Sequence, residues 1–148
     1  MNSGGIIQGG LLAGMVINLG ESILNAFLVA GSWNGVAAIL GYEQGGADIM
    51  MSYLMGFLLG IAGVWFYAIA RPRLGPGPGT AFKVGFVVWF VGWFWHNVSL
   101  MTLGELFPMD LLLISTVWTM VEIPVAVIAG AWLYTEVKPK LEEEEVAA

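Results

Sequence analysis

The chain has 148 residues, of which 58% are hydrophobic and 11% are charged, and its formal charge at neutral pH is −6. A mean hydropathy of +0.82 excludes an ordinary soluble domain, and the long apolar runs exclude a disordered chain. The sequence therefore predicts an integral membrane protein, with the lipid bilayer as its first partner.

Composition excludes two further classes of function. The chain has only five basic residues and they form no stripe, so we expect no nucleic-acid partner. It has no cysteine and a single histidine, which excludes disulfides, thiolate metal sites and a haem held by two histidines of one chain. No cofactor and no metal site are therefore expected.

The first expected membrane helix covers about Ile6 to Ala30, since roughly 20 apolar residues are enough to cross a hydrocarbon core. Its polar residues Asn18, Glu21, Ser22 and Asn25 follow at i, i+3, i+4 and i+7, so they share one helical face. A carboxyl group is costly inside a membrane, so Glu21 marks a candidate site.

The next two expected elements are a short helix and a second membrane helix, neither of which contains a charged residue. Ser32 is a suitable N-cap for the short helix, which we expect to lie in the membrane interface. The second membrane helix covers about Ile49 to Ala70 and repeats small residues every four positions, at Ser52, Gly56 and Gly60. This spacing allows close contact between helices, and it favours packing inside the bundle over packing between protomers.

A proline-rich joint separates the second and third membrane helices. Prolines at positions 72, 76 and 78 predict a stiff, extended turn over residues 71–80. The third helix, about Ala81 to Met101, carries Trp89, Trp93 and His96 on roughly one face. His96 is expected to be a hydrogen-bonded interfacial side chain, with a response to external pH or ligation of a tetrapyrrole as alternatives.

The fourth expected helix, about Met109 to Tyr134, repeats the polar pattern of the first. Its three polar residues follow at i, i+4 and i+7 and so form one face. They are Ser115, Thr119 and Glu122. Pro124 cannot donate to the carbonyl of Met120, which predicts a kink and a free carbonyl beside Glu122.

If the polar faces of the first and fourth helices meet, their side chains form one intramembrane polar seam. The seam consists of Asn18, Glu21, Asn25, His96, Ser115, Thr119 and Glu122. Two interpretations stay open. In the first, the seam is glue between helices, with neutral acids hydrogen-bonded to Asn18, Ser115 or Thr119. In the second, it is an operating site that holds a proton, a small cation or a chain of water molecules.

The positions of the basic residues predict the orientation of the chain. All of them flank one side of the expected bundle, at Arg71, Arg73, Lys83, Lys138 and Lys140. The positive-inside rule then places both termini in the cytoplasm. We expect one membrane domain over residues 1–135 and an acidic cytoplasmic tail over residues 136–148.

An internal repeat predicts how the helices are connected. Residues 61–73, IAGVWFYAIARPR, align without gaps on residues 128–140, IAGAWLYTEVKPK. The repeat favours an all-α, four-transmembrane-helix bundle built from two tandem helical hairpins. Its aromatic residues are expected to form a belt at the inner interface. They are Trp65, Tyr67, Trp132 and Tyr134.

Three stretches carry a resemblance to a known group of proteins: GGLLAGMVINLGESILNAFLV, WFYAIARPRLGPGPGTAFK and LLLISTVWTMVEIPVAVIAGAWLY. Over Gly9 to Tyr134 the chain resembles an uncharacterised family of small bacterial four-helix integral membrane proteins of about 150 residues. The resemblance implies a location in the bacterial inner membrane and assigns no activity.

For function, the sequence favours a non-enzymatic structural or accessory membrane protein, for example a subunit of a larger membrane complex. The alternative is a proton-coupled transporter or channel for ions or small solutes that uses Glu21 and Glu122 as protonation sites. An enzyme ranks last, because the sequence shows no nucleophile with a base, no metal cluster and no nucleotide loop.

Overall fold

The computed structural model describes residues 1–103 and 106–136, and this part of the chain is largely helical. Helix α1 (Ser3–Ile23) continues as a π-helical turn (Leu24–Leu28) and is followed by the short α2 (Ala30–Leu40). Helix α3 (Gly46–Leu74) returns along the bundle. The third pass consists of α4 (Pro78–Trp89), a second π-helical turn (Phe90–Phe94), α5 (Trp95–Leu100) and the 3₁₀ turn Met101–Leu103. Helix α6 (Met109–Leu133) completes the bundle.

Four of these passes are long and apolar enough to cross a membrane: Ser3–Leu28, Gly46–Leu74, Pro78–Leu103 and Met109–Leu133. Their outer faces expose large apolar side chains along their whole length, such as Leu19, Phe66 and Val121. A soluble protein rarely exposes so much contiguous apolar surface. The fold therefore indicates a multi-pass membrane protein, as the composition predicts.

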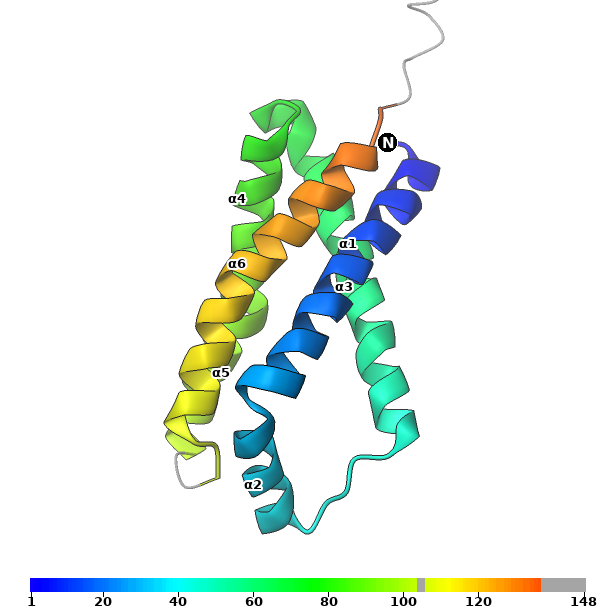
Figure 1. Cartoon of the computed structure of the whole chain (residues 1–148). Coiled ribbons are helices and arrows are strands. Elements are labelled where there is room, and N and C mark those ends of the chain that lie inside the picture. The colour runs from blue at the N-terminus through cyan, green and yellow to red at the C-terminus, as the bar shows by residue number, and fades with distance from the viewer. Residues whose placement is uncertain (104–105, 137–148) are drawn as a thin grey trace, which may run out of the picture.

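The helices are arranged so that α1 packs on α3 and α6, while α4 packs on α6 and, less extensively, on α3. Figure 1 shows the start of α1 and the end of α6 at one end of the bundle, with α2 at the opposite end. We call these the terminal end and the α2 end. The described basic residues Arg71, Arg73 and Lys83 belong to the terminal end.

Glycines set the distance between α1 and α3. A Cβ atom on Gly60 would lie 2.5 Å from the carbonyl oxygen of Gly10 and 2.7 Å from the Cα of Gly14. A Cβ on Gly56 would overlap the side chain of Asn18. The predicted use of these small residues for packing inside the bundle is therefore confirmed.

Several predicted boundaries need correction. Helix α3 continues through Pro72 to Leu74, so the extended turn expected over residues 71–80 is wrong for its first four residues. The missing N–H of Pro72 falls in the last turn, and the helix closes when Gly75 N–H donates to the Arg71 carbonyl at 2.9 Å. Helix α4 begins at Pro78, where a proline costs the helix no hydrogen bond.

The predicted short helix after α1 is confirmed, but it begins at Ala30 and Ser32 is not its cap. Instead the Ser32 hydroxyl donates to the Asp110 carboxylate at 2.8 Å and so ties α2 to α6. The helix ends at Gly41, whose positive φ of 62° suits glycine. In Figure 1, α2 runs on beyond α1 in nearly the direction of the bundle.

The predicted aromatic belt fails for the tyrosines and stays a prediction for the tryptophans. Trp65 and Trp132 are exposed, whereas Tyr67 and Tyr134 are buried with their rings in edge contact, 6.0 Å between centroids. Tyr134 also lies outside α6, in extended backbone, whereas Tyr67 is helical. The two copies of the sequence repeat therefore differ in conformation at residues 134–136, the described residues that follow Leu133.

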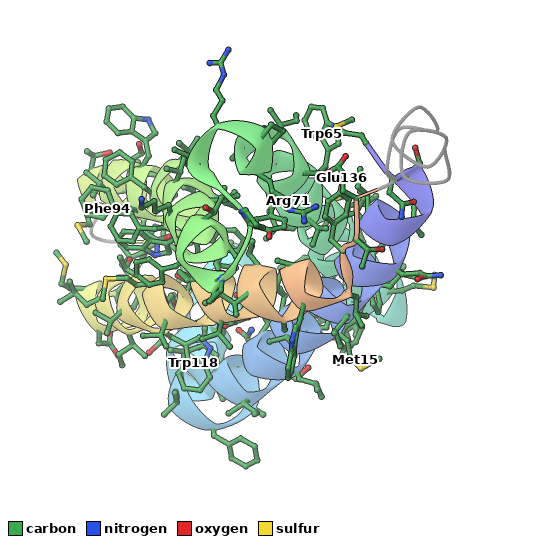
Figure 2. All side chains as sticks on the ribbon, turned by 90° about the horizontal axis from the view of Figure 1, so that it is seen from above. Met15, Trp65, Arg71, Phe94, Trp118 and Glu136 are labelled. Carbon is green, nitrogen blue, oxygen red and sulfur yellow. The ribbon has the colours of Figure 1, made fainter. Side chains whose placement is uncertain are left out.

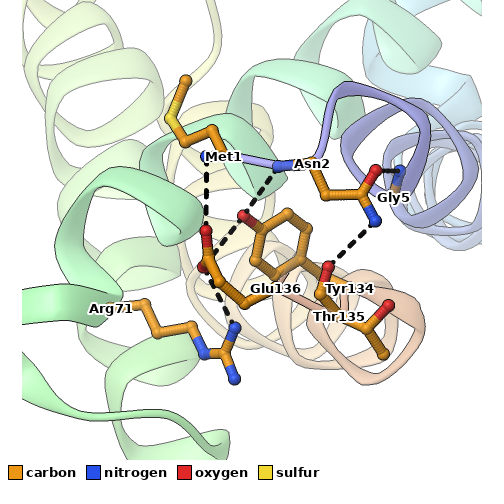
Figure 3. Close-up of polar contacts among 7 residues, drawn as sticks. All are labelled: Met1, Asn2, Gly5, Arg71, Tyr134, Thr135 and Glu136. Carbon is orange, nitrogen blue, oxygen red and sulfur yellow. Dashed lines mark hydrogen bonds and ion pairs between the residues drawn. The ribbon is translucent and has the colours of Figure 1, made fainter. Parts of the chain in front are cut away.

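Polar contacts around Glu136 close the terminal end (Figure 3). Its carboxylate accepts hydrogen bonds from Arg71 Nη1 and from the Tyr134 hydroxyl, each at 3.2 Å, and pairs with the N-terminal ammonium at 3.3 Å. Desolvation acts to raise the pKa of Glu136, but these partners outweigh it and hold the pKa below its ordinary value. The rest of the predicted acidic tail, including Lys138 and Lys140, lies outside the described residues.

Candidate functional site

Glu122 of α6 is buried inside the bundle without a bonding partner. Its side chain is 8% exposed, and neither carboxyl oxygen makes a hydrogen bond to any residue that the structure describes. The carboxyl group lies against Gly20 of α1, where an added Cβ would be 2.6 Å from the carboxyl carbon. Because Gly20 has no side chain, it leaves room for the carboxyl group in this position. Gly20 therefore belongs to the site, although the sequence analysis did not select it.

Trp118 lies one helical turn before Glu122 and is the second unpartnered group. Its indole Nε1 is buried and lies near the carboxyl group, but their geometry makes no hydrogen bond. Figure 2 shows the indole on the side of α6 that faces the blue α1–α2 segment. Leaving a buried polar group unbonded costs about 1–3 kcal/mol, so two such groups together call for an explanation.

A groove of about 710 Å³ runs between α1 and α6 beside these two residues. Apart from Glu122, all of its lining residues are apolar or glycine. They are Val16, Gly20, Leu113, Ile114, Val117, Trp118, Val121, Glu122 and Val125. The groove therefore offers an apolar surface, with the carboxyl oxygens of Glu122 and the indole N–H of Trp118 buried beneath it.

Glu21 points to a different place, a pocket of about 440 Å³ at the α2 end. Asn25 Nδ2 donates to the Glu21 carboxylate at 3.1 Å and to the Glu21 carbonyl at 2.7 Å, which fixes the side chain on its own helix. His96 and Ser115 line the same pocket. The structure thus brings four of the seven predicted seam residues together around this pocket.

Both π-helical turns of the described chain contribute to the wall of this pocket. Leu24 and Asn25 come from the first turn, and Gly92 and Trp93 come from the second. Such turns inside α-helices are frequent at functional sites. The remaining lining residues are Trp33, Asn97, Leu100, Phe107, Leu111 and Leu112.

Two predicted seam residues serve packing instead. Asn18 turns toward α3, where its Nδ2 donates to the Tyr53 carbonyl at 3.1 Å. Thr119 is fully buried, and its hydroxyl donates to the Ser115 carbonyl of its own helix at 2.7 Å. The expected continuous ladder is therefore divided among α3, the groove and the pocket, and of these two residues only Asn18 bonds a neighbouring helix.

The kink at Pro124 and the free Met120 carbonyl beside Glu122 stay predictions. Pro124 is fully buried and faces α4, where a Cβ on Gly85 would lie 2.5 Å from the proline Cα. Glu122 faces α1, so the two residues point to different neighbours. The Glu122 carboxyl group lies instead against Gly20, which directly precedes Glu21 in α1, and this places the two acids within range of a charge interaction.

The sequence analysis missed a second set of bonded side chains between α4–α5 and α6. Trp89 Nε1 donates to the Thr116 carbonyl at 3.1 Å, and Asn97 Nδ2 donates to the Thr116 hydroxyl at 2.7 Å. Asn97 was overlooked because a lone asparagine beside His96 shows no helical pattern. These bonds hold the wall of the pocket.

No group of three histidine, cysteine, aspartate or glutamate side chains that could hold a metal ion occurs within residues 1–103 and 106–136. His96 is exposed, and it is the one histidine among the residues that line the pocket.

Comparison with family models, with curated proteins and with solved structures gives no match to this chain. What can be stated about its class therefore rests on the fold: a helical, multi-pass membrane protein with an unpartnered carboxyl group between α1 and α6.

Proposed function

We propose that the protein is a proton-linked carrier of small polar solutes, and that Glu122 is its proton site. The observation that supports this most is the buried carboxyl group of Glu122, which has no hydrogen-bond partner among the described residues. An ionisable side chain within a membrane bundle is by default a functional site. The proposal includes the finer expectations from the sequence: two tandem hairpins, cytoplasmic termini, the bacterial inner membrane and a role without covalent chemistry.

The geometry argues against glue as the role of Glu122. As glue, the acid would bond Asn18, Ser115 or Thr119. Asn18 bonds α3, Thr119 bonds its own helix, and Ser115 lines the pocket at the α2 end. A carboxyl group that bonds nothing adds no stability to the packing of the helices. Exchange of a proton is therefore the better explanation of its presence.

Coupling to a solute requires that the proton site and the solute site influence each other. The pocket that holds Glu21 opens at the α2 end, and its acid is within electrostatic reach of Glu122. A charge that binds beside Glu21 therefore alters the free energy of ionising Glu122. This is the minimum that a proton-linked carrier needs.

The test is proton movement in reconstituted vesicles that contain a pH-sensitive dye. A pH gradient is imposed with choline, glycerol or acetate outside, one solute of each charge type. We expect wild-type protein to move protons with at least one solute, and Glu122→Gln to lose this flux while keeping its helical circular dichroism. Glu43→Gln, which changes an exposed acid in the loop before α3, is the control. Flux that matches empty vesicles, or that survives in Glu122→Gln, would overturn the proposal.

One observation favours a second candidate, an accessory subunit of a larger membrane complex. The apolar groove beside Glu122 has the form that a partner's transmembrane helix requires, and a polar side chain on that helix would bond Glu122 and Trp118. Purification in mild detergent with mass analysis tests it. A stoichiometric partner that is lost in a Val117→Trp variant, which fills the groove, supports this candidate.

A further inference from the structure

The pocket at the α2 end has two tryptophan walls from separate elements. Trp33 comes from α2 and Trp93 from the second π-helical turn, and Glu21 of α1 lines the same space. Trp33 is 43% exposed and so is not needed to fill the bundle core, whereas Trp93 is partly buried and packs against that core as well as lining the pocket. Two indoles and a carboxyl group around one cavity form an unusual combination for a packing surface.

One oxygen of the Glu21 carboxyl group is available in this pocket. Asn25 donates to Oε2 at 3.1 Å, whereas Oε1 has no hydrogen bond to the described residues and is not enclosed by them. Asn25 therefore positions the carboxyl group and leaves one oxygen for a ligand. Ser115 adds a hydroxyl group on the side of α6.

Charge around the pocket is of one sign. The described acidic residues at the α2 end are Glu21, Glu43, Asp48 and Asp110, and the described lining of the pocket contains neither lysine nor arginine. The described basic side chains belong to the terminal end, which is the opposite end of the bundle from the pocket. Such an arrangement attracts cations and repels anions before any contact forms.

From these observations we propose that the pocket binds a small organic ammonium ion. Indole faces attract ammonium groups, and a nearby carboxylate pairs with their positive charge. An inorganic cation would gain the same charge pairing, but it would gain no apolar contact with the indoles. A volume of about 440 Å³ suits a ligand of this size. This inference rests on the proposed function, because it names the chemical class of the solute that the carrier would take.

Binding is tested on purified wild-type protein in detergent by titration calorimetry. Choline is the probe, and 3,3-dimethyl-1-butanol, which has its shape without its charge, is the matched neutral ligand. We expect saturable binding of choline and binding of the alcohol that is at least about tenfold weaker. Equal affinity for the two ligands, or no saturable binding of choline, would overturn the inference. Potassium chloride that displaces choline with equal affinity would show an inorganic cation site and would also overturn it.

Two pairs of variants locate the site. Glu21→Gln and Trp93→Leu should each weaken choline binding by about tenfold or more. Their controls are Glu136→Gln at the terminal end and Trp95→Leu, since Trp95 is 67% exposed and does not line the pocket. If Trp93→Leu does not fold, Trp33→Leu on the exposed helix α2 replaces it. Equal affinity in each variant and its control contradicts the proposed site.

The outcome is separable from that of the proposed function. Choline binding without proton flux would retain the ammonium site and reject the carrier. Proton flux that depends on Glu122 but occurs with glycerol or acetate, and without choline binding, would retain the carrier and reject the ammonium site.

Discussion

Helix α1 meets its two main neighbours in different ways. Against α3, glycines bring the backbones into contact, and the polar side chain of Asn18 is bonded to the Tyr53 carbonyl. Against α6, contact is equally close at Gly9 and Gly130, but about three turns further along α1 the carboxyl group of Glu122 occupies the space at Gly20 without a bond. One interface has satisfied its polar groups and the other has not.

The difference shows that the role of a polar residue in a membrane helix depends on which group it bonds in the neighbouring helix, and not on its own chemistry alone. An amide bonded across an interface fixes two helices and has no capacity left. A carboxyl group that bonds nothing within the described chain contributes little to stability and retains its capacity for a proton or ligand. Four experiments on variants of the protein would contradict this comparison or make it more precise.

The largest effect is expected for Gly60→Ala at the closed interface. The new methyl group would meet backbone atoms of Gly10 and Gly14, which cannot move without separating the helices. We expect a loss of about 1–3 kcal/mol in the free energy of unfolding, measured by denaturation in detergent. Gly35→Ala in α2, where the added atom meets open space, is the control and should cost nothing. Equal stability of the two variants would show that the α1–α3 contact is looser than described.

A matched pair, Asn18→Leu and Glu122→Leu, should change stability in opposite directions. Asn18→Leu removes the hydrogen bond to α3 and should cost about 1–2 kcal/mol. Glu122→Leu replaces an unbonded carboxyl group with apolar atoms and should be neutral or stabilising by about 1–2 kcal/mol. Both are measured by the same denaturation. A loss of stability in Glu122→Leu as large as that in Asn18→Leu would mean that Glu122 is bonded after all.

A smaller effect on stability is expected for Gly20→Ala. The added Cβ would lie 2.6 Å from the carboxyl carbon of Glu122, at the flexible end of that side chain. The side chain can move aside, so the stability should fall by less than about 1 kcal/mol. Proton flux in vesicles should nevertheless fall, because the carboxyl group is displaced. Unchanged flux with an unchanged fold would separate Gly20 from the site.

The smallest effect concerns Glu136 at the terminal end. Its pKa is lowered in the folded protein, so its contribution to stability is complete above the ordinary carboxyl pKa and disappears as the pH falls through the lower, folded value. Glu136→Gln should reduce stability at pH 7 by about 0.5 kcal/mol or less, because the side chain is 38% exposed. The gap between the two proteins, followed by thermal unfolding, should close in acid below about pH 4. A difference in stability between the two proteins that grows in acid would show that the pKa of Glu136 is not lowered by folding.

The membrane passes could be predicted from the sequence because long apolar runs and glycine spacing act locally. The short helix before α3 and the packing use of Gly56 and Gly60 followed from the same signals. The end of α3 was less predictable. A proline in a last turn costs one hydrogen bond at most, so Pro72 did not stop the helix.

The site could be predicted only in part, since residues that share a helical face still divide between two neighbours. Asn18 and Glu21 are one turn apart on α1, yet Asn18 bonds α3 and Glu21 lines the pocket. Helical periodicity gives an angle around one axis and contains no information on where the next axes stand. Trp118 was missed for a related reason, because a tryptophan in an apolar helix shows nothing unusual until its N–H is found without a bond.

The two π-helical turns give the pocket a property that substitutions cannot probe. Each turn holds the equivalent of one inserted residue in a helix of 3.6 residues per turn, so everything downstream is rotated by about 100°. Deleting Gly92, for instance, is expected to return the third pass to a regular helix and to turn Trp93 and His96 together by about 100° relative to Trp89. The shape of the cavity is thus encoded by chain length as well as by residue identity, and single-residue insertions and deletions would reshape it more than any exchange of side chains.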